Sequence, residues 1–234
     1  MKQLNYNHII SLGYDCFPRI ILTRHGYKRT KGQGELTLPF DLAVHKNYYG
    51  LCAIIESSFK NYCNLDFLRV TQDDYIIENT QYNVRFYRES IDGKYEVYAS
   101  NNFAKFIERY EARIANFYRY IADDNILFVY RCKQYPSVLN RVIKSVFPQL
   151  TYKIVAFNTF FPRDAVMSDI YIDEACHKEI DYYALPFPYN NYVWWELEHY
   201  TSELGVRFEN RIADIISKYV DRLDPQSFER WPMN

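Results

Sequence analysis

The stretch that decides the fold reads Ile126-Leu-Phe-Val-Tyr130, then Pro136-Ser-Val-Leu-Asn-Arg-Val-Ile-Lys-Ser-Val146, then Lys153-Ile-Val-Ala-Phe157. The first and third segments are apolar without alternation, which is typical of strands that are buried on both faces. The middle segment repeats apolar residues every three to four positions, and this spacing predicts a helix. Two strands joined through a helix pair in parallel with a right-handed crossover, so the stretch predicts a β-α-β unit.

The same succession of strand and helix extends in both directions from this unit. Residues 8–12 form a short apolar run that Gly13 ends, and the following apolar residues recur at helical spacing as far as Gly26. A long amphipathic helix is predicted at 103–121, directly before the strand at 126–130. Further predicted elements are a helix at 51–59, a strand at 182–185, and a helical region from about 191 to 223 that breaks near Gly205. We therefore predict one α/β domain over residues 1–234, with a mostly parallel central sheet flanked by helices.

Residues 74–100 carry a different signal. Val84-Arg-Phe-Tyr-Arg88 and Tyr95-Glu-Val-Tyr98 are rich in β-branched and aromatic residues. They flank Asp92-Gly93, a dipeptide suited to a tight hairpin turn. We predict a small β-hairpin insertion at about 74–100.

Composition narrows the class of protein. The chain has 234 residues, and 28 Lys+Arg against 29 Asp+Glu give a formal net charge of -1. That length suits one domain, and the balanced charge argues against a dedicated nucleic-acid-binding protein. No apolar run reaches the roughly 18 residues that a membrane span needs. The first ten residues alternate polar and apolar instead of forming the apolar stretch of a signal peptide. We expect neither a nucleic-acid partner nor a membrane span.

The cysteines indicate a reducing compartment. The chain has 5 cysteines, an odd number, and none of them forms a C-x-x-C pair. This pattern argues against a disulfide framework and against a structural zinc site. We expect a cytoplasmic protein with reduced thiols, no bound metal and no cofactor.

The first predicted strand leads to a candidate nucleophile. In an open α/β sheet, ligands bind beyond the carboxyl ends of the strands. The first strand ends at Gly13-Tyr-Asp15-Cys16, so Cys16 falls in the first turn of the next helix. A helix N-terminus stabilises a thiolate and can bind an oxyanion, and Gly13 would let the backbone approach a ligand closely. The alternative is an inert thiol packed under the sheet.

A thiol nucleophile needs a base. Of the five histidines, only His45 is predicted to lie near Cys16. His8 begins the strand that Cys16 follows, so about 3.3 Å per residue puts the two well over 10 Å apart. His25 lies roughly 13 Å along the helix that Cys16 opens. His177 precedes a predicted strand, at the opposite edge of the sheet. His199 lies well inside a predicted helix, away from the strand ends. His45 remains, and a structurally hydrogen-bonded side chain is the alternative role for it.

Two polar residues follow the carboxyl ends of the later strands. Arg131 comes directly after the strand at 126–130, and Asn158 comes directly after the strand at 153–157. Together with Gly13 and Asp15 they are candidate substrate-binding residues at the same edge of the sheet. The alternatives are a salt bridge for Arg131 and a turn for Asn158.

Several short motifs resemble those of a bacterial protein family. Ser11-Leu-Gly-Tyr-Asp-Cys16 and Leu38-Pro-Phe-Asp-Leu42 resemble the S-L-G-x-x-C…P-F-D-W pattern of the DUF1796 family, which is described as papain-like cysteine peptidases. Tyr110-Glu-Ala-Arg-Ile-Ala-Asn-Phe117 resembles the family's Y-x-R-R-I-x-R-F helix, and residues 126–131 its following strand. The resemblance implies that Cys16 is the nucleophile and Asp41 a second site residue.

The chain also departs from the family pattern. Leu42 replaces the tryptophan, and Ala112 and Asn116 replace two basic residues of the helix. The family's expected His-Asp pair has no counterpart, because residues 83–89 contain no histidine. These differences leave the identity of the base open and leave room for a member without catalytic activity.

Together these patterns predict a cysteine hydrolase or acyl transferase. Cys16 would attack a carbonyl, His45 would move protons and Asp41 would orient His45, on a small-molecule, peptide or glycan substrate. A second enzyme class is an SGNH-like esterase, because Gly13-Tyr-Asp15 loosely resembles its Gly-Asp-Ser motif. The alternative outside enzymes is a glycan- or nucleotide-binding accessory protein that uses some of the 24 Tyr and 16 Phe as stacking platforms.

Overall fold

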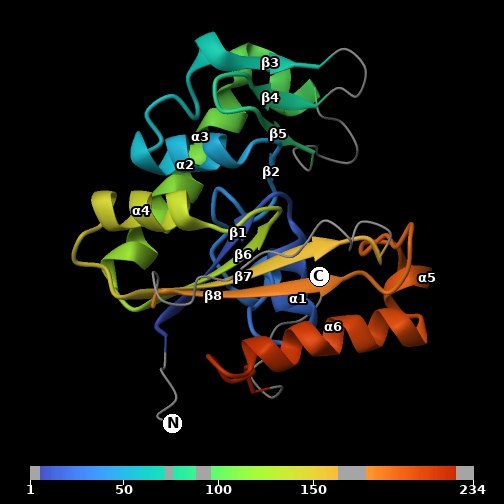
Figure 1. Ribbon diagram of the computed structural model, residues 1–234. Coiled ribbons are helices and arrows are strands. Elements are labelled where there is room, and N and C mark those ends of the chain that lie inside the picture. The colour runs from blue at the N-terminus through green and yellow to red at the C-terminus, as the bar shows by residue number, and fades with distance from the viewer. Residues whose placement is uncertain (1–5, 72–75, 88–95, 163–177, 225–234) are drawn as a thin grey trace.

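A four-stranded parallel sheet forms the centre of the fold. The computed structural model describes residues 6–71, 76–87, 96–162 and 178–224 (Figure 1). Sheet A consists of β1 (His8–Gly13), β6 (Ile126–Cys132), β7 (Tyr152–Phe160) and β8 (Ile180–Pro186), in the order β1-β6-β7-β8. Every neighbouring pair in this sheet is parallel. The predicted fold class, a mostly parallel sheet flanked by helices, is confirmed.

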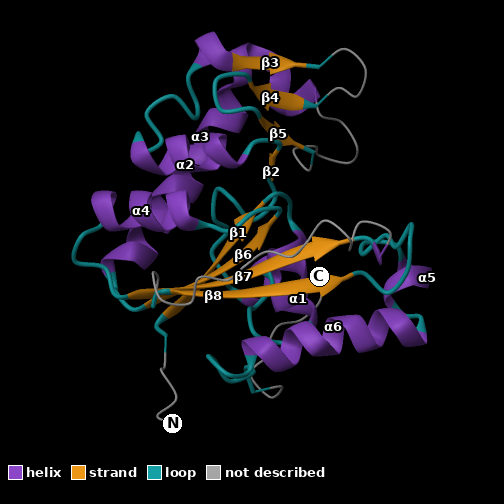
Figure 2. Ribbon diagram, viewed as in Figure 1, coloured by secondary structure: helices purple, strands orange, loops and turns teal. Residues whose placement is uncertain are grey.

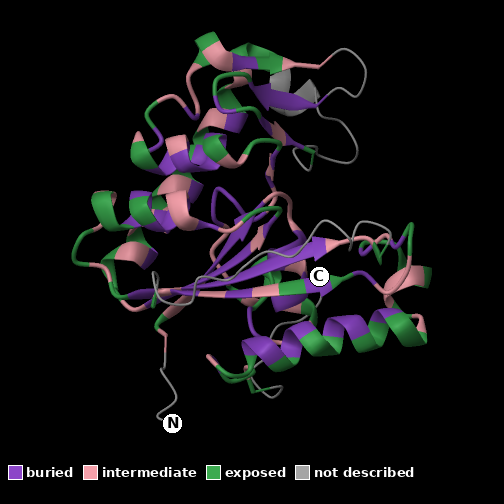
Figure 3. Cartoon of the chain, viewed as in Figure 1, coloured by how far each residue is buried: buried purple, intermediate pink, exposed green. Residues whose placement is uncertain are grey.

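Helices cover both faces of sheet A (Figure 2). On one face, α1 (Phe17–Arg24) and α6 (Glu203–Ile216) pack against Leu127, Val129, Val155 and Phe157. On the other face, α2 (Tyr48–Glu56), α3 (Glu96–Ala122) and α4 (Ser137–Val146) pack against the alternate strand residues, which include Phe128 and Ile154. Figure 3 shows that the two central strands, β6 and β7, are mostly buried between these layers, as their continuous apolar sequence predicts. The edge strand β8 has both buried and exposed positions.

A second, antiparallel sheet stands beyond the carboxyl end of β1 (Figure 1). Sheet B consists of β2 (Val44–His45), β5 (Val84–Phe86), β4 (Ile77–Asn79) and β3 (Leu68–Val70), in the order β2-β5-β4-β3. The strand predicted at 95–98 is wrong, because residues 96–98 belong to α3. β5 already has β2 and β4 as neighbours, so it needs no downstream partner. The predicted turn at 92–93 lies outside the described residues.

The remaining elements lie close to their predicted places. α2 begins three residues earlier than expected, and its N-cap is Asn47. In the C-terminal region, α5 (Leu197–Tyr200) and α6 are separated at Thr201–Ser202, where the Ser202 hydroxyl accepts from the Gly205 amide at 3.1 Å. Gly205 therefore lies inside α6 rather than at the break. Two short 3-10 helices complete the described chain: η1 (Lys31–Gln33) and η2 (Leu65–Phe67). No helix within the described ranges is both long and apolar enough to span a membrane.

Candidate active site at the end of β1

Gly13 brings the end of β1 unusually close to β6. Its φ is +146°, and a Cβ at this position would lie 2.8 Å from the Arg131 carbonyl oxygen. The amide of Tyr14 donates to that same oxygen at 3.1 Å. A side chain at position 13 would therefore collide with β6 backbone, which explains the glycine in the S-L-G motif.

Cys16 is the N-cap residue of α1, at the carboxyl end of β1. The Asp15 carboxylate accepts a hydrogen bond from the Phe17 amide at 3.1 Å, and Pro18 has no amide hydrogen to satisfy. The Ile20 amide donates to the Cys16 carbonyl at 3.1 Å, which closes the first turn. Cys16 is half-buried at the margin of the apolar cluster formed by α1 and α6. The thiol thus lies in the strand-to-helix connection where the sequence places it.

Arg131 fixes this connection to sheet A. Its guanidinium forms an ion pair with Asp15, and its Nε donates to the Thr159 hydroxyl at 2.8 Å. Burial raises the pKa of Asp15, while Arg131 and the Phe17 amide act in the opposite direction. Asn158 is buried in β7, in register with Cys132 of β6. Arg131 therefore holds the turn that carries Cys16, whereas Asn158 lies beside a different cysteine.

His45 lies in a pocket of about 240 Å³ at the end of β1. Its amide donates to the Tyr14 carbonyl at 2.9 Å, and its Nδ1 lies 2.9 Å from the Gly13 carbonyl oxygen. A carbonyl only accepts, so Nδ1 carries the proton and Nε2 carries the lone pair. The side chain is 2% exposed, and Nε2 has no hydrogen-bond partner among the described residues. Burial lowers the pKa of His45 to about 4, which keeps the imidazole neutral at pH 7.

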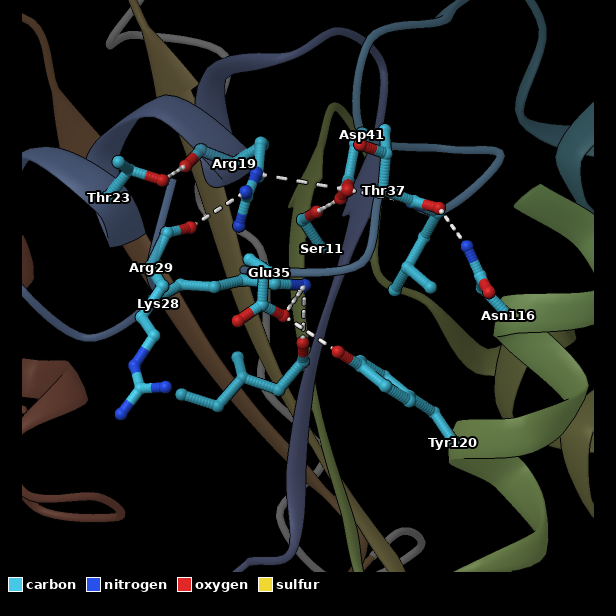
Figure 4. A network of polar contacts seen from close by, with 12 residues as sticks. Ser11, Arg19, Thr23, Lys28, Arg29, Glu35, Thr37, Asp41, Asn116 and Tyr120 are labelled. Atoms are coloured by element: carbon cyan, nitrogen blue, oxygen red, sulfur yellow. Dashed lines mark hydrogen bonds and ion pairs between the residues drawn. The ribbon is translucent and has the colours of Figure 1, made fainter. Parts of the chain in front are cut away.

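Asp41 belongs to a different cluster of contacts (Figure 4). Its carboxylate accepts from the Ser11 hydroxyl and, at 2.9 Å, from the Leu38 amide, and it faces Arg19 Nε at 3.8 Å. The expected orientation of His45 by Asp41 is not what the structure shows, because Gly13 holds His45 Nδ1. Ser11 and Asp41, the serine and aspartate of the two short motifs, instead join β1 to the segment before β2.

Buried charges continue from Asp41 toward α3. Lys28 donates to the Ile9 carbonyl at 2.9 Å and lies 3.6 Å from Glu35, whose carboxylate also accepts from the Tyr120 hydroxyl at 2.8 Å. Burial lowers the pKa of Lys28, and Asp41 opposes that shift. Figure 4 shows these side chains gathered between β1, the 28–41 segment and α3. The sequence shows this segment only as a polar loop, and nothing in its spacing predicts buried ion pairs.

The other described cysteines are poor nucleophiles. Burial raises the pKa of Cys52 to about 11 and that of Cys63 to about 12, and it raises the pKa of Cys132 still further. These three thiols are therefore protonated at neutral pH. The four described cysteines, Cys16 among them, form no disulfide.

The structure brings His45 and Cys16 to the same end of β1 but into different surroundings. The residues lining the His45 pocket include Gly13, Tyr14, Tyr48 and Cys132, and Cys16 is not among them. Cys132 is a site residue that the sequence did not predict, because the predicted strand ended at residue 130 and the observed β6 continues to 132.

One comparison with known proteins gives a match. The family model described as "Putative papain-like cysteine peptidase (DUF1796)" matches residues 7–161, which is more than half of the chain. A search of curated proteins and a search of solved structures each found no match. The matched range includes Cys16, Asp41 and His45, and the family's description supports cysteine hydrolysis at the level of the family. By this match, the chain belongs to the DUF1796 family.

Proposed function

We propose that the protein is a cysteine hydrolase or acyl transferase in which Cys16 is the nucleophile. The observation that carries the proposal is the place of Cys16, which occupies the N-cap position of α1 at the carboxyl end of a parallel strand. The partial positive charge of a helix N-terminus favours a thiolate over a thiol. The Arg131 guanidinium forms an ion pair with the adjacent Asp15, so it offsets the negative charge of that carboxylate in the same turn.

The proposed reaction begins with attack of the Cys16 sulfur on a carbonyl carbon. The amides of Tyr14 and Phe17 already donate to Arg131 O and to Asp15. We therefore assign an oxyanion contact to the amide of Asp15. The acyl group would then pass from the sulfur to water in a hydrolase, or to another nucleophile in a transferase.

We propose His45 as the base, through its Nε2 atom. The Gly13 carbonyl fixes the tautomer that leaves Nε2 able to accept a proton, as a carboxylate does in other catalytic sites. A pKa of about 4 disfavours a stable imidazolium, so His45 would not form a lasting ion pair with the thiolate. The N-terminus of helix α1 would stabilise the thiolate in place of His45.

Thiol alkylation tests the nucleophile and the base separately. The rate of reaction with iodoacetamide is measured against pH, by mass spectrometry of the peptide containing Cys16, for wild type, Cys16→Ser and His45→Ala. Cys63 provides an internal control, because burial raises its pKa. We expect Cys16 to titrate below the value of about 8.5 for a free thiol. Titration like a free thiol would refute Cys16 as an activated nucleophile. An activated Cys16 in His45→Ala with unchanged acyl-transfer activity would refute only His45 as the base.

The substrate class and the compartment belong to the same proposal. A reactive thiol without a disulfide partner suits a reducing cytoplasm. A small-molecule, peptide or glycan substrate with an ester, thioester or amide carbonyl would meet the chemistry of Cys16.

Non-catalytic binding is the second candidate function, and the composition of the His45 pocket favours it. Tyr14, Tyr48, Tyr49 and Tyr130 line the pocket, and the Tyr48 ring lies 5.5 Å from Tyr49 and 6.4 Å from Tyr130. Such rings can stack a sugar or a base. Slow, ordinary reactivity of Cys16 together with saturable binding of a sugar or nucleotide would favour this function over catalysis.

A further inference from the structure

The His45 pocket changes in character from its floor to its mouth. It lies where sheet A meets sheet B, and its residues come from the ends of β1 and β6, from β2 and from the first turn of α2 (Figure 1). Its floor includes the buried side chains of His45, Leu51 and Tyr130. Its mouth includes exposed side chains: Lys46, Lys133 and Gln134. A ligand therefore meets polar groups at the mouth and mainly apolar surface below them.

The two lysines at the mouth have no acidic partner. Lys46 and Lys133 form no ion pair within the part of the chain that the structure describes, and none of the lining residues is an aspartate or a glutamate. Lys133 acts electrostatically on Asp15, but that carboxylate is already paired with Arg131. The Lys133 ammonium lies 4.3 Å from the centroid of the Tyr14 ring, and this cation–π contact keeps it at the mouth. Both charges are therefore available to a bound anion.

The start of α2 adds to the positive potential at the mouth. The N-cap of this helix is Asn47, and no acidic residue lies in its first turn. Asn47, Tyr48 and Tyr49 all line the pocket, so the helix begins at the pocket wall. The N-terminus of a helix carries a partial positive charge and favours anions. The pocket therefore combines two lysines and a helix N-terminus without a carboxylate among its lining residues.

His45 leaves an unsatisfied acceptor at the floor. The Gly13 carbonyl holds Nδ1–H, so Nε2 carries a lone pair. The side chain is 2% exposed, and Nε2 has no hydrogen-bond partner among the described residues. A buried acceptor without a donor is unfavourable, and a hydroxyl or an N–H group of a ligand would satisfy it. Between the floor and the mouth, the rings of Tyr48 and Tyr130, 6.4 Å apart, offer apolar faces to a ring of the ligand.

We propose that the His45 pocket binds a small organic acid, which consists of a ring with one anionic group and, on its far side, a hydroxyl or N–H group. The anionic group would meet Lys46, Lys133 and the start of α2, and the hydrogen-bond donor would bond His45 Nε2. The volume of about 240 Å³ suits a ligand smaller than the drug-sized molecules that occupy roughly 300–1,000 Å³.

The pocket lies beside the turn that carries Cys16. Tyr14 lines the pocket and is two residues before Cys16, so their Cα atoms are at most about 7 Å apart. An organic acid that extends past Tyr14 therefore reaches this turn. That the organic acid is the substrate rests on the proposed cysteine chemistry, whereas its binding to the pocket does not.

Three small ring compounds test the site. In 4-hydroxybenzoate both groups are present, whereas benzoate lacks the hydrogen-bond donor and phenol lacks the anionic group. Affinities are measured by NMR titration of the full chain in the Cys16→Ser background, so that the result is independent of any reaction at the thiol. We expect 4-hydroxybenzoate to bind about fivefold or more tightly than either of the other two compounds.

Lysine substitutions locate the anionic group. Replacing both residues, Lys46→Gln with Lys133→Gln, is expected to weaken binding of 4-hydroxybenzoate about fivefold and to leave binding of phenol unchanged. Both side chains are exposed, so this variant is expected to fold. Lys60→Gln is the matched control, because Lys60 is also exposed and lies outside the pocket lining.

The outcomes separate the pocket from its proposed use. Equal affinities for phenol and 4-hydroxybenzoate, or no effect of the two lysine substitutions, would overturn the anion site. Benzoate binding as tightly as 4-hydroxybenzoate would overturn the hydrogen bond to His45. In the chain that retains Cys16, bound 4-hydroxybenzoate is expected to slow alkylation of the thiol by iodoacetamide. Binding without this protection would overturn the substrate role alone, and an activated Cys16 in a chain that binds none of the compounds would overturn the pocket alone.

Discussion

Gly13 shows how one residue limits the shape of the candidate active site. A Cβ at position 13 would lie 2.8 Å from the Arg131 carbonyl oxygen, in a backbone conformation with φ of +146°. Gly13→Ala therefore combines backbone strain with a collision against β6. We expect a loss of about 2–4 kcal/mol in the free energy of unfolding, measured by urea denaturation.

Gly26 provides the matched control for this substitution. Its φ is +75°, but nothing lies within 4 Å of a Cβ built there. Gly26→Ala should therefore show the effect of backbone strain alone, a loss of about 1 kcal/mol in the free energy of unfolding. Equal losses in the two variants would mean that the close contact between β1 and β6 contributes nothing to stability.

His45 makes stability depend on pH. Its pKa in the folded protein is about 4, below the ordinary value of 6.5, so the unfolded chain binds the proton more tightly. Stability should be unaffected by His45 above pH 6.5 and should fall as the pH drops from 6.5 toward 4, by up to about 1.4 kcal/mol per pH unit. His45→Gln should lose less stability than wild type between pH 7 and pH 5 in urea denaturation. A parallel pH dependence in both proteins would contradict a buried neutral imidazole.

The order of the predicted elements places the candidate residues Cys16 and His45 near the end of the first strand, but it does not predict which groups their side chains contact. A cysteine after a strand end and a histidine on the following segment follow from the order of the elements. His45 forms its hydrogen bond with the Gly13 carbonyl and not with Asp41. This partner depends on where the 38–45 segment crosses β1, and the spacing of residues in the sequence does not predict that crossing point. Side-chain partners across a loop depend on tertiary packing, which one sequence does not reveal.

At the scale of elements, buried charge joins the 28–41 segment to β1 and α1. Asp41 is 0% exposed and faces Arg19, and its charge also acts on buried Lys28. Asp41→Asn removes the negative charge but keeps the size of the side chain. We expect a loss of about 3–5 kcal/mol in the free energy of unfolding, because buried cations would then lack compensation.

A substitution at an exposed aspartate is the control for the loss of a negative charge that is not buried. Asp66 lies in η2 and is exposed, so Asp66→Asn should change the free energy of unfolding by less than about 0.5 kcal/mol. If Asp41→Asn were as stable as Asp66→Asn, Asp41 would not be holding the segment. Such a result would favour a direct role of Asp41 in the proposed reaction over a role in stability.

Elements with strong periodicity were predictable, and elements that depend on neighbours were not. The continuous apolar runs gave β1, β6 and β7, and the three-to-four spacing gave α3 and α4. Residues 96–98 are helical, and residues 100–103, which have non-helical φ/ψ values, separate them from the long part of α3. Strand propensity depends on an available partner, and β5 takes its two partners from β2 and β4.

At the scale of the whole molecule, two apolar clusters lie on the two faces of sheet A. One cluster joins α1, α6 and Trp194 to the sheet. The other runs without interruption from sheet A through α3 to the strands of sheet B, and it includes both Ile154 and Phe86. Because β6 and β7 contribute side chains to both clusters, we predict that the chain unfolds as one cooperative unit.

The tryptophans make this prediction measurable. Trp194 is 3% exposed in the cluster on the α6 face. In a background with Trp195→Phe and Trp231→Phe, tryptophan fluorescence therefore follows the side of the molecule away from sheet B, whereas far-ultraviolet circular dichroism follows all of the secondary structure. Phe86 is 2% exposed in sheet B, with its ring centroid 4.8 Å from both Phe106 and Tyr110. Phe86→Ala should destabilise the protein by about 3–5 kcal/mol, enough to lower the urea midpoint by roughly 1–2 M.

In one cooperative unit, that shift appears equally in fluorescence and in circular dichroism. Tyr87→Ala, at the neighbouring position with a side chain 48% exposed, should leave both midpoints nearly unchanged. A fluorescence midpoint that stays at the wild-type value while circular dichroism becomes biphasic would show that sheet B unfolds by itself. In that case the candidate site, which takes Cys16 from the sheet A side and His45 from β2 of sheet B, would lie where two units meet, and its geometry would change whenever sheet B opened.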